Sequence, residues 1–179
     1  SGIVFLSFVS SNKVVGYYAA VEKLFRAIVG LFMPITQALY PISCRKVNQP
    51  EIAKSYIKKI AIVIGSMALA VGIVVALLSD HIITLVYGLI FQTYSYILAI
   101  MMIWLFFGVI NNVIGIQYLS AMRHDKLYTV SFIVAGTVTV LLNALLIPYF
   151  LINGILFSMI VGEILLTACM LGLIFRFKL

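Results

Sequence analysis

The sequence predicts an all-α transmembrane protein, a polytopic helix bundle that crosses the bilayer about five times. Hydrophobic residues make up 64% of the 179-residue chain and charged residues only 9%, against about 45–50% and about 25% in soluble domains. Several apolar runs reach the roughly 18–20 residues needed to cross the hydrocarbon core. These runs are continuous and do not alternate with polar residues, which argues against a transmembrane β-barrel.

The first two apolar segments cover residues 1–10 and 15–42. The first is too short to span a bilayer, and it has neither a basic region before it nor a small-residue cleavage site after it. We therefore expect the end of a truncated span and not a signal peptide. The second contains Pro34, which should kink the helix because proline lacks a backbone N–H and clashes with the preceding turn.

A short amphipathic helix is predicted at residues 48–59. It starts with the sequence NQPE, which resembles a capping box. Ile52, Tyr56 and Ile60 then recur every fourth residue, with lysines on the other faces. Such a helix lies in the membrane interface, here on the cytoplasmic side, and it leads into the next predicted span at 60–78.

Four further segments complete the pattern. A short helix is expected between a Ser/Asp cap at Ser79 and a glycine stop at Gly88. Three spans follow at 94–122, 127–147 and 154–175, and Pro148 should end the second of them.

The basic residues indicate how the chain is oriented. Strict alternation of the spans puts nine of the twelve Lys and Arg residues on one side, which the positive-inside rule makes cytoplasmic, together with the C-terminus. This orientation explains the net charge of +7 better than nucleic-acid binding does. The lysines at 54–59 would also contact anionic lipids. The nine are Arg45, Lys46, Lys54, Lys58, Lys59, Arg123, Lys126, Arg176 and Lys178.

Small and polar residues recur on single helix faces in three of the spans. These stripes have two interpretations: close helix packing with interhelical hydrogen bonds, or the wall of a hydrophilic cavity. Under the second interpretation Asn112 and Asn143 are the cavity-lining polar residues. The stripes are Gly108, Asn112 and Gly115; Gly136, Thr139 and Asn143; and Ser158 with Gly162.

Three charged residues, Glu22, Lys23 and Arg26, fall inside the first third of the span at 15–42. A charge in the bilayer core costs at least ~2.5–3.5 kcal/mol on insertion scales, so such residues need water, a cavity or a partner. Glu22 and Arg26 are four residues apart and can pair on one helix face. The set is either a structural bridge near the helix end or a net-positive anion site in a cavity.

The same stretch carries a resemblance to a known family. The run VGYYAAVEK at 15–23, then Arg26-Ala27, then PITQALYP at 34–41, resembles the Wzx-type O-antigen flippases of the multidrug/oligosaccharidyl-lipid/polysaccharide (MOP) exporter superfamily. In that family this stretch is the eighth of twelve spans. The resemblance therefore implies most of the C-terminal lobe of a MATE/MOP-like two-lobed transporter, with its N-terminal lobe missing.

The resemblance also implies a function. Such proteins translocate an undecaprenyl-diphosphate-linked oligosaccharide, such as an O-antigen repeat unit, across the bacterial inner membrane by alternating access. The proposed substrate site is Lys23, Arg26 and Glu22 with the neighbouring Tyr17 and Tyr18. The implied partners are the lipid-linked substrate, membrane lipids, the N-terminal lobe and polysaccharide polymerase machinery.

Glu163 is a second embedded charge, near the middle of the last span. It has three interpretations: a neutral, hydrogen-bonded structural group with Thr167 one turn away as its partner, a proton- or cation-coupling site, or a contact for sugar hydroxyls. We expect no metal site, cofactor or catalytic set from the isolated His81, His124, Cys44 and Cys169.

Two alternatives to the flippase remain. A MATE-like drug/cation antiporter would favour an acidic cavity, whereas the cluster at 22–26 is net basic. A membrane-embedded polysaccharide-processing enzyme would need a large outer loop with catalytic groups, and the longest one, about 79–93, offers Asp80 and His81. We therefore expect a transporter and not an enzyme.

Overall fold

A computed structural model describes residues 2–46 and 49–177, all-helical over most of their length and without a β-strand in this part of the chain. The predicted all-α fold class is thus confirmed. Within these residues, four stretches are long and apolar enough to span a membrane: Asn12–Cys44, Glu51–Leu77, Leu89–Ser120 and Asp125–Arg176. The elements are α1 (Gly2–Val9), α2 (Asn12–Gly30), α3 (Met33–Cys44), α4 (Pro50–Leu77), α5 (Ser79–Tyr87), the 3-10 helix η1 (Leu89–Tyr94), α6 (Ser95–Asn112), the π-helix η2 (Val113–Ser120) and α7 (Asp125–Arg176).

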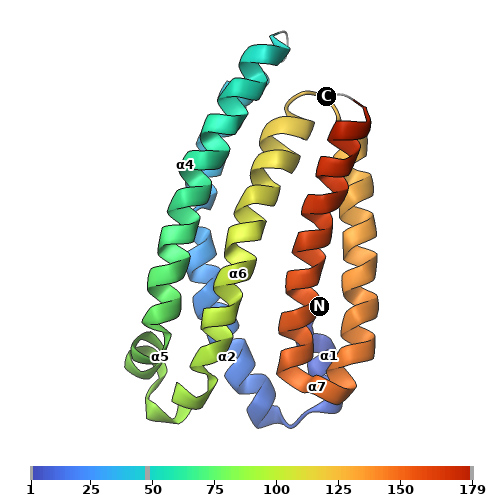
Figure 1. The fold of residues 1–179 in the computed structure, drawn as a ribbon. Helices are drawn as coiled ribbons and strands as arrows, with labels where there is room; N and C mark the ends of the chain where they lie inside the picture. The colour runs from blue at the N-terminus through green and yellow to red at the C-terminus, as the bar shows by residue number, and fades with distance from the viewer. Residues whose placement is uncertain (1, 47–48, 178–179) are drawn as a thin grey trace.

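The long helix α7 is two antiparallel arms joined by a sharp reversal (Figure 1). The backbone turns at Leu151, with φ 48° and ψ −121°. A Cβ at Gly154 would lie 2.8 Å from the Leu146 carbonyl oxygen, so the tight turn needs a glycine there. We call residues 125–150 the first arm and 152–176 the second arm. The predicted spans 127–147 and 154–175 each fall within one arm, and the reversal comes three residues after Pro148.

The predicted kink near Pro34 is a break between two helices. Helix α2 ends at Gly30 and α3 begins at Met33, with Pro34 in its first turn. Proline is tolerated there because the first backbone N–H groups of a helix have no helical partner. The break redirects the chain beside the cavity described below.

Helix α4 is longer than predicted at its N-terminal end. The predicted helix at 48–59 is continuous with the span at 60–78, apart from Asn48, which lies outside the described residues. Ala53, Ile57 and Ile60 are buried, whereas Lys54 and Lys58 are exposed. The first turns of α4 therefore have one packed face and one basic face.

The short helix predicted after this span is confirmed, but not its cap. Helix α5 begins at Ser79 and ends before Gly88, which has φ 92°. No side chain caps its N-terminus. Asp80 instead accepts a hydrogen bond from the Ser95 hydroxyl, which ties α5 to the start of α6.

The chain alternates between two ends of the bundle (Figure 1). The start of α4 and the connection from η2 to α7 lie at the same end as the C-terminal end of α7, whereas α5 and the reversal of α7 lie at the other. Eight of the nine basic residues predicted to share one side of the membrane belong to the segments at the end with the C-terminal end of α7. The ninth, Lys178, lies outside the described residues. The predicted alternation therefore fits the fold, and a cytoplasmic location of this end stays a prediction.

Helix α6 forms the centre of the bundle, between α4 and α7 (Figure 1). Its side chains Ile97, Leu98, Met101 and Leu105 are at most 1% exposed. This buried face of α6 leaves little room for polar groups, so the amides near its C-terminal end need specific partners. Those amides form part of the candidate site.

Candidate functional site

An open cavity of about 240 Å³ lies beside the break between α2 and α3. Its walls come from α2–α3, from α6 and η2, and from both arms of α7. Glu163 carries the one ionisable carboxylate among the described lining residues, which are otherwise apolar, aromatic or neutral polar. The other residues used below are Thr36, Trp104, Asn111, Asn112, Tyr128 and Phe132.

The Glu163 side chain is held by a buried amide. Asn111, which is 4% exposed, donates from Nδ2 to Glu163 Oε2 at 2.6 Å and to the Glu163 main-chain oxygen at 3.0 Å. The Thr167 hydroxyl lies 2.6 Å from Asn111 Oδ1 and 2.9 Å from the Glu163 main-chain oxygen. Together they form a three-residue network between α6 and the second arm.

This network corrects one expectation and adds a residue. Thr167 was the expected partner of the Glu163 carboxyl, but its hydroxyl reaches the main-chain oxygen and Asn111 instead. Asn111 was not predicted, because the stripe through Gly108 and Gly115 selected Asn112, one position further along α6. A carboxyl group in an apolar span needs a hydrogen-bond donor, which another helix can supply. This need could have indicated in advance that an amide of α6 would bind Glu163.

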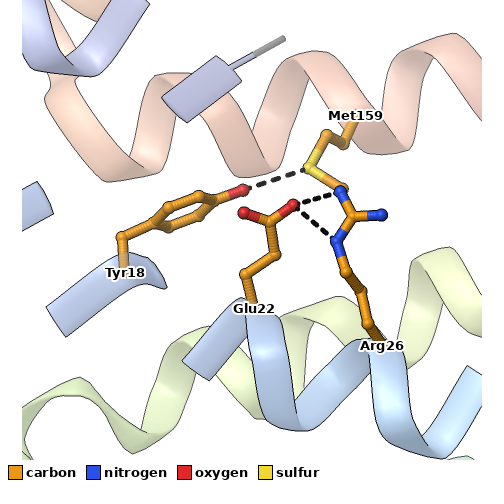
Figure 2. Close-up of polar contacts among 4 residues, drawn as sticks. All are labelled: Tyr18, Glu22, Arg26 and Met159. Carbon is orange, nitrogen blue, oxygen red and sulfur yellow. Dashed lines mark hydrogen bonds and ion pairs between the residues drawn. The ribbon is translucent and has the colours of Figure 1, made fainter. Parts of the chain in front are cut away.

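Glu22 and Arg26 form the predicted ion pair on α2 (Figure 2). Arg26 donates to Glu22 Oε1 from Nη2 at 2.5 Å and from Nε at 3.1 Å. The Arg26 side chain is 72% exposed, whereas that of Glu22 is 16% exposed. The guanidinium is therefore held in place by one oxygen and stays open to an incoming anion.

Met159 connects this pair with the Glu163 network. Its sulfur accepts a hydrogen bond from the Tyr18 hydroxyl at 3.6 Å, beside Glu22 and Arg26 (Figure 2). Met159 and Glu163 also line a second pocket together, and they are one helical turn apart on the second arm. The Tyr18–Met159 contact thus joins α2, near the ion pair, to the second arm one turn before Glu163.

The remaining residues of the predicted substrate site differ in exposure. Lys23 is exposed. Tyr17 stacks on Tyr94, with 4.4 Å between ring centroids, in an aromatic cluster. Tyr18 is 1% exposed and packs in the core. We therefore leave Tyr17 and Tyr18 out of the proposed contact set and assign them to packing between α2 and its neighbours.

The two asparagines predicted to line a cavity lie in different environments. Asn112 lines the cavity, and its Oδ1 is buried without a hydrogen-bond partner among the described residues. Asn143 is 1% exposed, and its Oδ1 also has no partner among the described residues. Asn112 thus lines the cavity beside the break between α2 and α3, and Asn143 is buried on the first arm.

Two glycines of the polar stripes mark close helix contacts. A Cβ at Gly162 would overlap the Thr139 hydroxyl oxygen, and one at Gly115 would overlap the Tyr128 ring. These contacts hold the two arms of α7 together and hold η2 against the first arm. The packing interpretation of the stripes therefore applies at Gly162 and Gly115.

Within the described part of the chain, no group of three or more His, Cys, Asp or Glu side chains could hold a metal ion. Both cysteines are free. The polar chemistry of the site consists of the ion pair, the carboxyl network and the cavity amides.

Comparisons with known proteins give two matches. A family model described as "PelG: Putative exopolysaccharide Exporter (EPS-E)" matches residues 52–177. A protein of Escherichia coli (strain K12) named "Putative O-antigen transporter" is 28% identical over 178 residues, which is 99% of this chain and 43% of the relative. The chain thus spans less than half the length of this relative. No solved structure matches the chain.

Proposed function

The chain belongs to the exopolysaccharide exporter family, and on that premise we propose that it forms the C-terminal lobe of a flippase for a lipid-linked oligosaccharide. The substrate is an undecaprenyl-diphosphate-linked repeat unit, of O-antigen or similar type, at the bacterial inner membrane. The name of the Escherichia coli relative and its greater length support both the substrate class and a missing N-terminal lobe.

The observation that carries this proposal is the open guanidinium of Arg26. It is 72% exposed within an apolar helix and is oriented by Glu22. A planar guanidinium can donate two parallel hydrogen bonds to a phosphate. A diphosphate could therefore bind at Arg26, with the exposed Lys23 adding a second positive charge.

The rest of the substrate follows from its chemistry. The polyprenyl tail can stay among lipid acyl chains, while the sugars occupy the polar space between this lobe and the missing one. Alternation of the two lobes would then expose the site to each side in turn. Glu163, in the neighbouring cavity, would couple that change to a proton or a cation, with the C-terminus on the cytoplasmic side.

One observation favours a second candidate, a drug/cation antiporter of MATE type. Glu163 is the charged group of the cavity, and Trp104, Tyr128 and Phe132 line it too. A carboxylate surrounded by aromatic rings suits an organic cation. The basic groups of α2 lie outside this cavity, so the two candidates use different residues of the same lobe.

Reconstitution of the full-length carrier in proteoliposomes distinguishes them. Transport should be measured for an undecaprenyl-diphosphate-linked oligosaccharide and for a lipophilic organic cation. We expect flipping of the lipid-linked sugar that decreases with Glu22→Gln plus Arg26→Gln. Transport of the cation alone, lost with Glu163→Gln and retained in the double variant, would replace the flippase with the antiporter.

A further inference from the structure

We propose that Asn111 and Thr167 are positioning residues that keep Oε2 of Glu163 as a hydrogen-bond acceptor, so that a proton reaches this carboxyl only at Oε1. The proposal rests on the coupling role given to Glu163 above and specifies the oxygen through which coupling occurs. Neither Asn111 nor Thr167 carries a charge, and neither contacts the proposed substrate site.

The chemistry of the main chain fixes the orientation of the Asn111 amide. One amide atom lies 3.0 Å from the Glu163 main-chain oxygen, which can only accept a hydrogen bond. That atom must therefore be the NH₂ nitrogen and not the carbonyl oxygen. Its second hydrogen points to Glu163 Oε2 at 2.6 Å. Asn111 Oδ1 then faces the Thr167 hydroxyl, which can donate to it at 2.6 Å.

The network leaves the two carboxyl oxygens in different states. Oε2 accepts from Asn111 whether Glu163 is ionised or neutral, because a reversed amide would place its carbonyl oxygen about 3.0 Å from the Glu163 main-chain oxygen, and two acceptors repel each other. Oε1 has no hydrogen-bond partner among the described residues. Protonation therefore forms the O–H bond at Oε1, and deprotonation releases that proton into the cavity, with no other reactant needed.

Among the described residues that line its cavity, Glu163 has no competing carboxylate or amine. The α2–α3 wall contributes no ionisable side chain among its described lining residues, and α6 and η2 contribute the neutral amides Asn111 and Asn112. The first arm contributes the Tyr128 phenol. The nearest ion pair, Glu22 with Arg26, lies beside Met159, one turn before Glu163.

Infrared titration of the full-length protein in lipid tests this directly. The protonated Glu163 band is identified as the carboxyl signal that Glu163→Gln removes. Asn111→Leu takes away a donor to the ionised form, so the titration midpoint should rise by about one pH unit or more. Thr167→Val should raise it less, because Asn111 can still donate, and Thr167→Ser should restore the wild-type midpoint.

The matched control is Thr137→Val, the same change on the same helix. Thr137 is exposed on the first arm and lines neither of the pockets that contain Glu163, so the midpoint should not move. An unchanged or lowered midpoint in Asn111→Leu overturns the inference. If that variant does not fold, an unchanged midpoint in Thr167→Val overturns it instead.

The outcome for coupling is read separately. Wild-type transport by Glu163→Gln, with the same pH dependence, would reject the coupling role while the titration shifts could still occur. Transport that depends on Glu163 but has the same pH profile in Asn111→Leu would reject the positioning role alone. The two failures are thus distinguishable.

Discussion

Neutralising both members of the Glu22–Arg26 pair should separate protein stability from transport. The double change Glu22→Gln plus Arg26→Gln keeps two hydrogen-bonding side chains of similar size and removes both charges. The pair joins residues four apart on one helix, and its Arg26 side chain is 72% exposed. Ion pairs of this kind contribute about 0.3–0.5 kcal/mol to the stability of a helix. The free energy of unfolding of the double variant should therefore fall by less than about 1 kcal/mol.

The expected loss of transport is much larger. A hydrogen bond between a charged donor and a phosphate oxygen contributes roughly 1.5–3 kcal/mol. Since about 1.4 kcal/mol corresponds to a tenfold change, loss of this contact should slow flipping about 10- to 150-fold. Arg26→Gln alone should be worse for assembly, because it leaves the Glu22 carboxylate, 16% exposed, without its partner.

The assay is complementation of a strain that lacks the full-length carrier, with initial flipping rates in proteoliposomes and thermal stability of the purified protein. Lys13→Gln is the matched control, because Lys13 is an exposed basic residue at the other end of the same helix. Flipping by the double variant within twofold of wild type, at normal stability, would refute the assignment of Arg26 to the substrate.

Three further predictions concern coupling, packing and topology. Glu163→Gln should abolish or uncouple flipping at normal expression, and wild-type transport with unchanged pH dependence would remove the coupling role. Gly162→Ala should lower the free energy of unfolding by about 1–3 kcal/mol in a detergent-unfolding titration, because the new Cβ overlaps the Thr139 hydroxyl. Adding Thr139→Ala should recover most of that loss. Purely additive losses in the double variant would contradict the contact. Cysteines placed at Asp80 and His124 in a cysteine-free protein should react with an impermeant reagent from opposite sides of the membrane, and labelling from the same side would contradict the topology.

The sequence predicted the helical class and the Glu22–Arg26 pair because both follow from local periodicity. Apolar runs of spanning length need no tertiary information, and residues four apart meet on any helix. The break near Pro34 was predictable for the same reason. The continuity of α4 through residues 50–77 could not be predicted in this way. The Ala53 and Ile57 side chains are buried by neighbouring helices and do not belong to the apolar pattern predicted for this segment.

The carboxyl network lay beyond the sequence because it joins residues far apart in the chain. Asn111 and Glu163 are brought together by the reversal at Leu151 and by the packing of the second arm against α6. The stripe of small and polar residues was chosen from one helix alone and therefore selected Asn112, whereas the partner of Glu163 is decided by the packing of the second arm against Asn111. Tyr17 and Tyr18 were assigned to the substrate by their place next to Glu22, whereas packing decides their exposure.

Photocrosslinking tests the central claim most directly, because it asks whether the substrate touches the basic surface of α2. A photoreactive side chain at position 23 of the full-length carrier is irradiated with labelled undecaprenyl-diphosphate oligosaccharide, beside a control at Val63, an apolar residue of α4 that is 64% exposed. We expect labelling at position 23 that unlabelled undecaprenyl diphosphate displaces, with little at position 63. Equal labelling at both positions, or labelling at position 23 that undecaprenyl diphosphate does not displace, would contradict the proposed substrate site.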